Sequence, residues 1–203
     1  MPVLTTARAK ELAWPELTGS TQDALIAIYV AGAESWVASF LGFPVYDSGT
    51  SAALSVQTYT LYPRGYADQV LELGIQPVAT VTSLHISKVR DYDSASLIAA
   101  ADYTLVTARG QVELVYAADY ARWPEGDRNI KAVVTAGYSA LPDAMELAVA
   151  LVARSMWSDS QQKRAKVSSK SGNGGSTQYT DNVMPQSALD LLRPLRNPSA
   201  VIG

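Results

Sequence analysis

The side chains that could carry out catalysis are few in this sequence, because it holds one histidine and no cysteine. The lack of cysteine excludes disulfides, thiolate nucleophiles and cysteine metal sites. His85 lies between Leu84 and Ile86 in an alternating stretch, so we expect it to point to the opposite face of a strand. A lone histidine with no visible orienting partner is a weak candidate for acid–base chemistry, and no G-x-S-x-G pattern supports a serine nucleophile. We interpret His85 as a histidine of a sheet face and predict that the protein is not an enzyme.

Two other patterns resemble ligand sites only in part. Asp91, Asp93 and Asp102 could supply oxygen ligands, but the central glycine and terminal glutamate of a calcium loop are missing. Aspartate is common in turns, so we interpret these three as turn residues. The glycine-rich stretch 172–175 follows no expected strand and lacks the GK[ST] ending of a phosphate-binding loop, which indicates a linker. The sequence therefore predicts no metal and no cofactor.

One basic cluster stands out near the C-terminal end of the chain. It consists of Lys163, Arg164, Lys166 and Lys170. No acidic residue lies between Asp159 and Asp181, so nothing nearby neutralises these charges. Two interpretations remain open: a solvated loop, or a contact with an acidic partner surface or with the phosphates of passing DNA. Aromatic residues are not interleaved with the lysines, so stacking on single-stranded DNA has no support here.

The composition indicates a surface that is short of charge and therefore suited to contact with partners. Charged residues make up 17% of the 203 residues, below the roughly 25% usual for a soluble domain. The net charge of −3 argues against a chain that traps nucleic acid electrostatically. The N-terminus lacks the apolar region of a signal peptide, and no apolar run approaches the roughly 20 residues of a membrane span. We expect a soluble protein of the cytoplasm that does not enter a membrane.

The first third of the chain is expected to be helical. A helix over 22–41 would begin after Thr21 as N-cap and end at Gly42. Residues of its expected core face recur at helical spacing: Leu25, Ile28, Tyr29, Gly32, Trp36, Val37, Phe40 and Leu41. The other face is rich in alanine, which would allow close approach of another helix. A shorter helix is expected over 7–14.

The middle of the chain is rich in short strands. Alternating, β-prone residues occur over 56–62, 69–73, 78–87, 103–106, 111–116 and 130–135. Six short strands with tight turns predict a small antiparallel sheet or a barrel-like module.

The last third returns to helix and holds the most informative stretch of the sequence, 123–157. A helix beginning at Pro142 and Asp143 runs without a charge over 147–153 and should end near Trp157. Such an apolar helix must be covered on nearly all sides, and we expect neighbouring subunits to supply part of the cover. After it, residues 158–182 are polar and rich in serine and glycine, which predicts a mobile loop. A short helix over 186–192 follows.

These elements predict an α+β fold. A helical frame, formed by the N-terminal helix, the long apolar helix and the short C-terminal helix, carries an inserted antiparallel β module and a long flexible loop. We expect one folded unit with a helical part (1–53), a β-rich insertion (54–138) and a second helical part (139–203) that includes the loop 158–182. Large apolar residues are expected as core or subunit-interface anchors: Trp36, Phe40, Trp123, Tyr138, Leu151 and Trp157.

Several short motifs, in this order, resemble the head–tail connector (neck adaptor) proteins of tailed bacteriophages. The landmarks are the helix end 36–44, the Pro77-Val78 strand with Val81-Thr82-Ser83, Asp102-Tyr103 with the Gly110 turn, Trp123-Pro124, Thr135-Ala136-Gly137-Tyr138, the apolar helix 142–153 and the ending 191–196. The resemblance covers about 22–196. The shared order and spacing of these landmarks carry the resemblance.

The resemblance implies a structural virion protein. Such proteins form a ring, typically of twelve copies, that joins the portal at the capsid vertex to the stopper or tail completion proteins. The ring leaves a channel through which genomic DNA passes without sequence-specific binding. It implies a location in the virion neck, with assembly in the host cytoplasm. We expect the basic cluster and the C-terminal segment to contact the portal, the latter through Leu191, Leu192, Arg193, Leu195 and Arg196.

Three alternatives remain open from the sequence. The chain could be another ring component of a phage neck or tail, such as a stopper or a tail terminator. It could be a small enzyme with a dispersed site, which a purified monomer with a deep polar pocket would favour. A soluble DNA-binding module is the third, and the charge balance argues against it.

Overall fold

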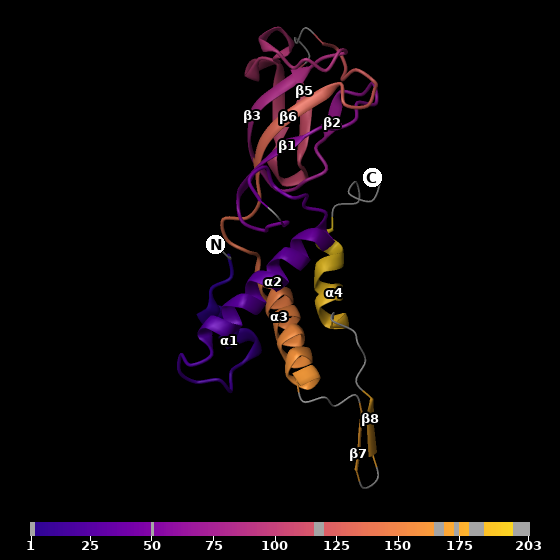
Figure 1. Cartoon of the computed structure of the whole chain (residues 1–203). Coiled ribbons are helices and arrows are strands. Elements are labelled where there is room, and N and C mark those ends of the chain that lie inside the picture. The colour runs from indigo at the N-terminus through magenta and orange to yellow at the C-terminus, as the bar shows by residue number, and fades with distance from the viewer. Residues whose placement is uncertain are drawn as a thin grey trace. The chain divides into compact units, whose positions relative to one another are not determined.

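The protein has an α+β fold, as the sequence predicts (Figure 1). The computed structural model describes residues 3–49, 51–115, 120–164, 169–172, 175–178 and 185–196. The chain divides into two compact units. A helical unit combines Met1–Val37 with Ala140–Leu195, and a β unit combines Ala38–Ser139 with Arg196–Gly203. The first division falls inside a helix, between Val37 and Ala38.

Four α-helices are described: α1 (Thr6–Ala13), α2 (Asp23–Leu41), α3 (Asp143–Arg164) and α4 (Gln186–Leu192). Their starts agree with the sequence to within about one residue. Thr5 is the N-cap of α1, since its hydroxyl oxygen accepts the Arg8 N–H at 3.3 Å. Gly42 has a φ of 91° and ends α2, as expected from its ability to adopt a left-handed backbone. The local signals for helix ends were therefore reliable.

α3 is longer than the sequence indicates, because it continues past Trp157 to Arg164. The Ser160 hydroxyl donates to the Trp157 carbonyl at 2.7 Å and accepts from the Tyr29 hydroxyl at 2.6 Å. This contact with α2 helps to keep the last, polar turns of α3 helical, although they have no apolar face of their own. Strands β7 (Ser169–Gly172) and β8 (Gly175–Gln178) also pair, within the stretch expected to be a loop. The expectation of a loop over all of 158–182 is therefore wrong at its start and in this hairpin.

The chain itself covers most of α3, so neighbouring subunits are needed for less of the cover than the sequence led us to expect. Its fully buried side chains are Met145, Ala148, Val149, Ala150, Val152 and Ala153. α1 and α4 both pack against α3. Arg8 of α1 pairs with Glu146 at 3.0 Å, and Arg154 donates to the Ala13 carbonyl at the end of α1. Leu147 and Leu151 remain half-buried, so little apolar surface on α3 still needs a partner.

The β unit consists of two three-stranded antiparallel sheets. β1 (Gln57–Leu61), β6 (Ile130–Ala136) and β3 (Val78–Ile86) form the first in the order β1-β6-β3. β2 (Val70–Glu72), β5 (Gln111–Leu114) and β4 (Tyr103–Val106) form the second in the order β2-β5-β4. Every strand expected from the alternation is present, and they form two small sheets.

The landmark residues of the sequence occupy fixed positions in the β unit. Trp123 is fully buried, and its indole N–H lies 2.9 Å from the Gln69 carbonyl oxygen and 3.2 Å from that of Val112. Gly137 follows β6 with a φ of 120°, and a Cβ there would lie 2.5 Å from the Ser55 carbonyl oxygen. Only glycine fits both conditions without strain. Gly137 therefore sets the direction in which the chain leaves β6.

Candidate functional site

The candidate site is the surface of the helical unit around α2. Its buried face holds Ile26, Val30, Ala33, Val37, Ala38 and Leu41. Of the eight residues that the sequence placed on the core face, only Val37 and Leu41 are buried. Ile28 is 67% exposed, while Leu25, Tyr29, Trp36 and Phe40 are half-buried. The expected core face was wrong, because both faces of α2 are apolar and spacing alone does not choose between them.

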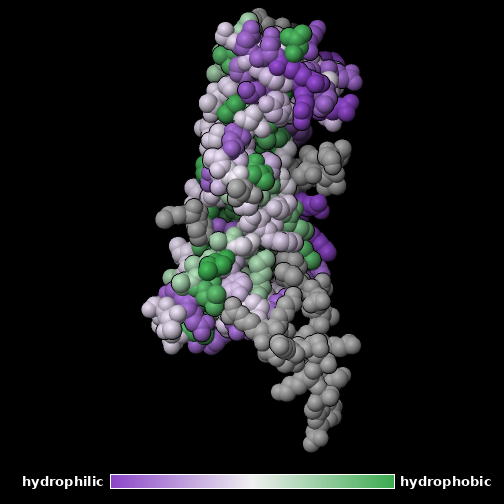
Figure 2. Space-filling model, viewed as in Figure 1, coloured by the Kyte–Doolittle hydropathy of each residue, from purple (hydrophilic) through white to green (hydrophobic). Residues whose placement is uncertain are grey.

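An exposed apolar strip lies on the side of α2 that faces away from its core. It consists of Ala24, Ala27, Ile28 and Ala31, of which only Ala27 is half-buried. Spacings of three and four residues place them on one face of the helix. Figure 2 shows hydrophobic residues, in green, grouped on the face of the helical unit that is in view. We call these four residues the α2 strip; their exposure leaves apolar surface available for a partner.

By length and composition α2 is also able to cross a membrane, so the expectation that no apolar run is long enough was wrong. Buried helices of soluble proteins pass the same test. α2 carries Glu34 on its buried face, where the carboxylate accepts the Leu4 N–H at 2.6 Å. Burial raises the pKa of this carboxyl group, and the backbone hydrogen bonds of Leu4 and Val3 oppose that shift. The only acid in the middle of α2 is therefore used inside the helical unit.

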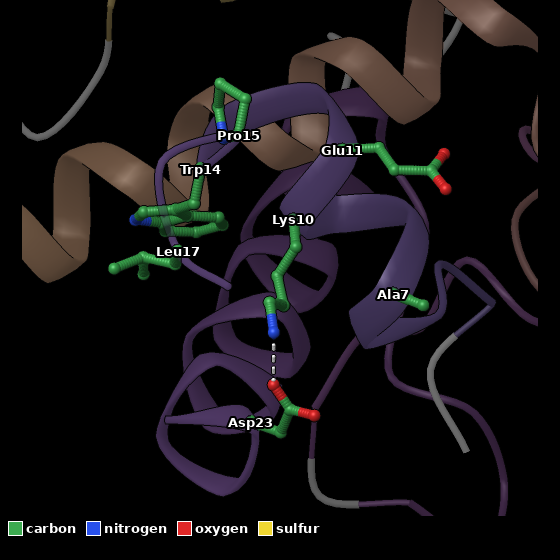
Figure 3. A pocket seen from close by; sticks show the side chains of 7 residues that line it. All are labelled: Ala7, Lys10, Glu11, Trp14, Pro15, Leu17 and Asp23. Atoms are coloured by element: carbon green, nitrogen blue, oxygen red, sulfur yellow. Dashed lines mark hydrogen bonds and ion pairs between the residues drawn. The ribbon is translucent and has the colours of Figure 1, made fainter. Parts of the chain in front are cut away.

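A pocket of about 520 Å³ lies between α1, the loop after it and the start of α2. Its lining residues are Ala7, Lys10, Glu11, Trp14, Pro15, Leu17 and Asp23. Figure 3 shows Trp14 and Leu17 side by side on one wall, and the Lys10 ammonium reaching Asp23, at 2.8 Å. Glu11 points away from this pair. We call this the α1–α2 pocket; its lining offers apolar contact and the Lys10–Asp23 ion pair.

Two tryptophans pack against each other in the helical unit. The rings of Trp14 and Trp157 meet edge to face, with their centroids 6.1 Å apart. Trp14 is fully buried, and Trp157 is half-buried. Such pairs contribute about 0.5–1.5 kcal/mol beyond their buried area. Trp157 thus acts as a core anchor that ties α3 to the segment following α1.

The other expected anchors divide between core and surface. Trp123 is a core residue of the β unit. Trp36, Phe40 and Tyr138 are half-buried, and Tyr138 packs on Phe43 with centroids 6.2 Å apart. Leu151 is half-buried on α3. Half-buried aromatic residues are suited to an interface, and no residue of this group is fully exposed.

Of the residues expected to contact the portal, the structure describes the side chains of the C-terminal segment. Leu192 is fully buried in the helical unit, whereas Leu191 and Leu195 are half-buried. Arg193 and Arg196 are exposed; Arg193 pairs with Asp190 at 3.4 Å, and Arg196 lies 5.4 Å from the centre of the Phe40 ring. Leu192 therefore belongs to the core, and the two arginines remain on the surface.

The side chains of the basic cluster lie outside the described residues. This holds for Lys163 and Arg164 at the end of α3, for Lys170 in β7, and for the whole of Lys166. Their interactions stay a prediction.

The residues examined for chemistry have structural roles in the described part of the chain. His85 is half-buried, and its Nδ1 lies 3.2 Å from both the Asp93 carbonyl oxygen and the Ser96 hydroxyl. Asp93 caps a short turn by accepting the Ser96 N–H at 3.0 Å. Leu84 and Ile86 are buried, so the alternation around His85 is confirmed. No group of three or more metal-ligating side chains occurs among the residues described.

One cluster that the sequence did not indicate lies at the end of the first sheet. Tyr62 and Tyr92 pack with centroids 5.8 Å apart, Arg128 lies 5.7 Å from the Tyr62 ring centre and Lys131 lies 5.5 Å from that of Tyr92. The Tyr92 hydroxyl donates to the Arg128 carbonyl. Arg90 donates to the Asp127 carbonyl at 3.2 Å beside them. These contacts hold three loops together.

Comparison with known proteins gives a structural likeness without a family. No family model and no curated protein matches the sequence. The fold is similar to a chain in the neck of an empty GTA (gene transfer agent) particle with C6 symmetry, at 22% identity and a TM-score of 0.54, over 96% of this chain and 89% of that one. It is also similar to a chain in the neck of a native GTA particle with C12 symmetry, at 21% identity and a TM-score of 0.52, over 96% and 88%. This chain thus shares its fold, over nearly its whole length, with chains from the necks of GTA particles.

Proposed function

We propose that this protein is a structural component of the neck of a tailed phage or phage-like particle, where it forms a ring. The observation that carries the proposal is the shared fold with neck chains over 96% of the sequence. A likeness confined to one unit would point only to a common module, whereas here the helical and the β unit match together. Within the neck, we assign it the role of adaptor between the portal and the stopper or tail completion proteins, which the motif resemblance favours.

The surface of the helical unit supports ring formation. A closed ring of identical copies needs two different contact faces on each copy. The α2 strip offers an apolar face, and the low share of charged residues, 17%, suits surfaces that become buried. The C6 and C12 symmetries of the similar necks agree with a ring of twelve copies.

The described polar groups favour a structural role over catalysis. His85 holds a turn, and in the α1–α2 pocket Lys10 and Asp23 form an ion pair with each other. The net charge of −3 suits a channel through which DNA passes without being gripped. The proposal places the protein in the virion neck after assembly in the host cytoplasm, with no cofactor and no membrane.

Imaging the purified protein tests the ring directly. Mass photometry and negative-stain electron microscopy, on the protein alone and with its cognate portal, should show rings or ring-capped portals. Rings that bind the portal identify an adaptor, whereas rings that bind only a tail tube identify a terminator. A protein that stays monomeric and does not bind any neck component would refute the proposal.

The C-terminal contact with the portal needs a test that preserves the fold. Deleting residues from 185 onward would uncover α3, because Ala188 and Leu192 are buried. The double variant Arg193→Glu, Arg196→Glu changes only exposed side chains. We expect it to weaken co-sedimentation with portal particles at least tenfold, because arginine forms charge-assisted hydrogen bonds to carboxylates. Arg109→Glu, on an exposed turn of the β unit, is the control and should bind normally.

A further inference from the structure

The α2 strip is free of charge, although α2 is long. The two acids of α2 are Asp23 and Glu34. Asp23 pairs with Lys10, and Glu34 binds the backbone of the N-terminal segment. Ile28 therefore projects from a surface of alanines with no charged side chain of α2 beside it, at 67% exposure. Interface cores are depleted of charge in the same way.

The α1–α2 pocket is a hollow of matching chemistry. Pro15 and Leu17 keep apolar surface in it, whereas Trp14 behind them is fully buried. Lys10 pairs with Asp23 at 2.8 Å and Glu11 pairs with Arg8 at 3.1 Å, so an apolar side chain that enters would bury this surface without leaving an unpaired charge. A volume of about 520 Å³ accommodates an isoleucine side chain together with part of the helix that carries it.

The pocket and the projecting side chain lie on different sides of the same helix. Asp23, in the pocket lining, and Ile28 are five residues apart, which is about 140° around the helix axis at 3.6 residues per turn. The pocket and Ile28 both belong to the helical unit, so their positions relative to each other are defined. One copy therefore cannot use its own Ile28 to fill its own pocket. A neighbouring copy in a ring can, because ring contacts join two different faces.

We propose that Ile28 of one copy inserts into the α1–α2 pocket of the next copy, with the alanines of the α2 strip packing around the pocket rim. The inference rests on the proposed ring and specifies how its subunits meet. It assigns the exposed face of α2 to a second copy of this chain.

The absence of cysteine from the chain allows a clean cross-linking experiment. Ile28→Cys is combined with Leu17→Cys, or in a second variant with Ala7→Cys, which is an exposed position of the pocket lining. Disulfides require Cα atoms within about 7 Å, so only a close contact is captured. Rings, formed alone or on the portal, are oxidised mildly and separated without reductant. We expect a ladder of linked subunits beyond the dimer from at least one pair.

The controls separate this inference from the ring itself. Single cysteine variants should give no ladder, and neither should Val89→Cys with Leu17→Cys, although Val89 is 79% exposed. Ile28→Asp should reduce ring formation at least tenfold, whereas Val89→Asp should not. Two outcomes would overturn the inference and leave the proposed function standing. One is intact rings in which neither cysteine pair gives a ladder, and the other is an Ile28→Asp variant that forms rings as well as the unmodified protein. A cross-link from the Ile28→Cys variant to the portal would overturn it as well. Failure of the unmodified protein to form rings would refute both.

Discussion

Replacing Leu192 with alanine should destabilise the isolated protein strongly. Leu192 is fully buried, and α4 has only seven residues. A helix this short is not stable on its own, so its packing on α3 must hold it. Truncating a fully buried leucine costs about 2–5 kcal/mol. That is a large share of the roughly 5–15 kcal/mol by which native domains are stable.

The neighbouring Leu191 provides the matched comparison. It has the same chemistry and lies in the same helix, but it is half-buried. Leu191→Ala should cost about 1 kcal/mol, since part of its surface already meets water. Urea unfolding followed by circular dichroism and tryptophan fluorescence measures both variants. With a slope of about 2 kcal/mol/M, Leu192→Ala should lower the midpoint by about 1–2.5 M.

The experiment also tests whether the chain covers its own apolar helix. It must be run at a concentration where the protein is monomeric, because association would add stability through mass action. If α3 relied on neighbouring subunits, removing Leu192 from a monomer would cost little. Equal midpoints for Leu191→Ala and Leu192→Ala would therefore refute the packing of α4 on α3.

Three single contacts lead to further predictions. Gly137→Ala should lower the free energy of unfolding by about 1–3 kcal/mol, measured by urea unfolding, because the residue has a positive φ beside a carbonyl oxygen. The Tyr29–Ser160 hydrogen bond should show a coupling of about 0.5–1.5 kcal/mol in a cycle of Tyr29→Phe and Ser160→Ala. Glu34→Gln should stabilise the protein at pH 7, because burial raises the carboxyl pKa above 4.5 in the folded state, so the ionised form is penalised. Thermal unfolding should show this gain fading as the pH falls through the raised pKa toward 4.5, and an unchanged gain across that range would contradict it.

Much of the fold was predictable because its signals are local. The strand β4 and the helix α4 have the bounds that alternation and spacing indicated. Gly42 ended α2 as expected, since a left-handed residue stops a helix wherever it occurs. Such features depend on a few neighbouring residues, and the printed sequence contains all of them.

The end of α3 was not predictable in this way. Residues 158–164 are polar and have no apolar periodicity, so they read as the start of a loop. What keeps them helical is contact with α2 through Ser160 and Tyr29, which are 131 residues apart. The α1–α2 pocket was not predicted for the same reason, because it brings Lys10 and Trp14 of the α1 segment together with Asp23 at the start of α2.

The faces of α2 and α3 show where a sequence argument about assembly has to be corrected by packing. Both helices are apolar on more than one side, and the sequence pointed to the apolar α3, together with the alanine-rich face of α2, as contact faces between copies. Within the helical unit α1 and α4 pack on α3, while Ile28 on α2 stays exposed. The inference of missing cover therefore holds for α2 in place of α3. The α2 strip lacks charge, and the Lys10 and Asp23 charges of the pocket pair with each other. The proposed contact between copies should therefore depend mainly on burial of apolar surface, and we expect that high salt does not dissociate the proposed ring.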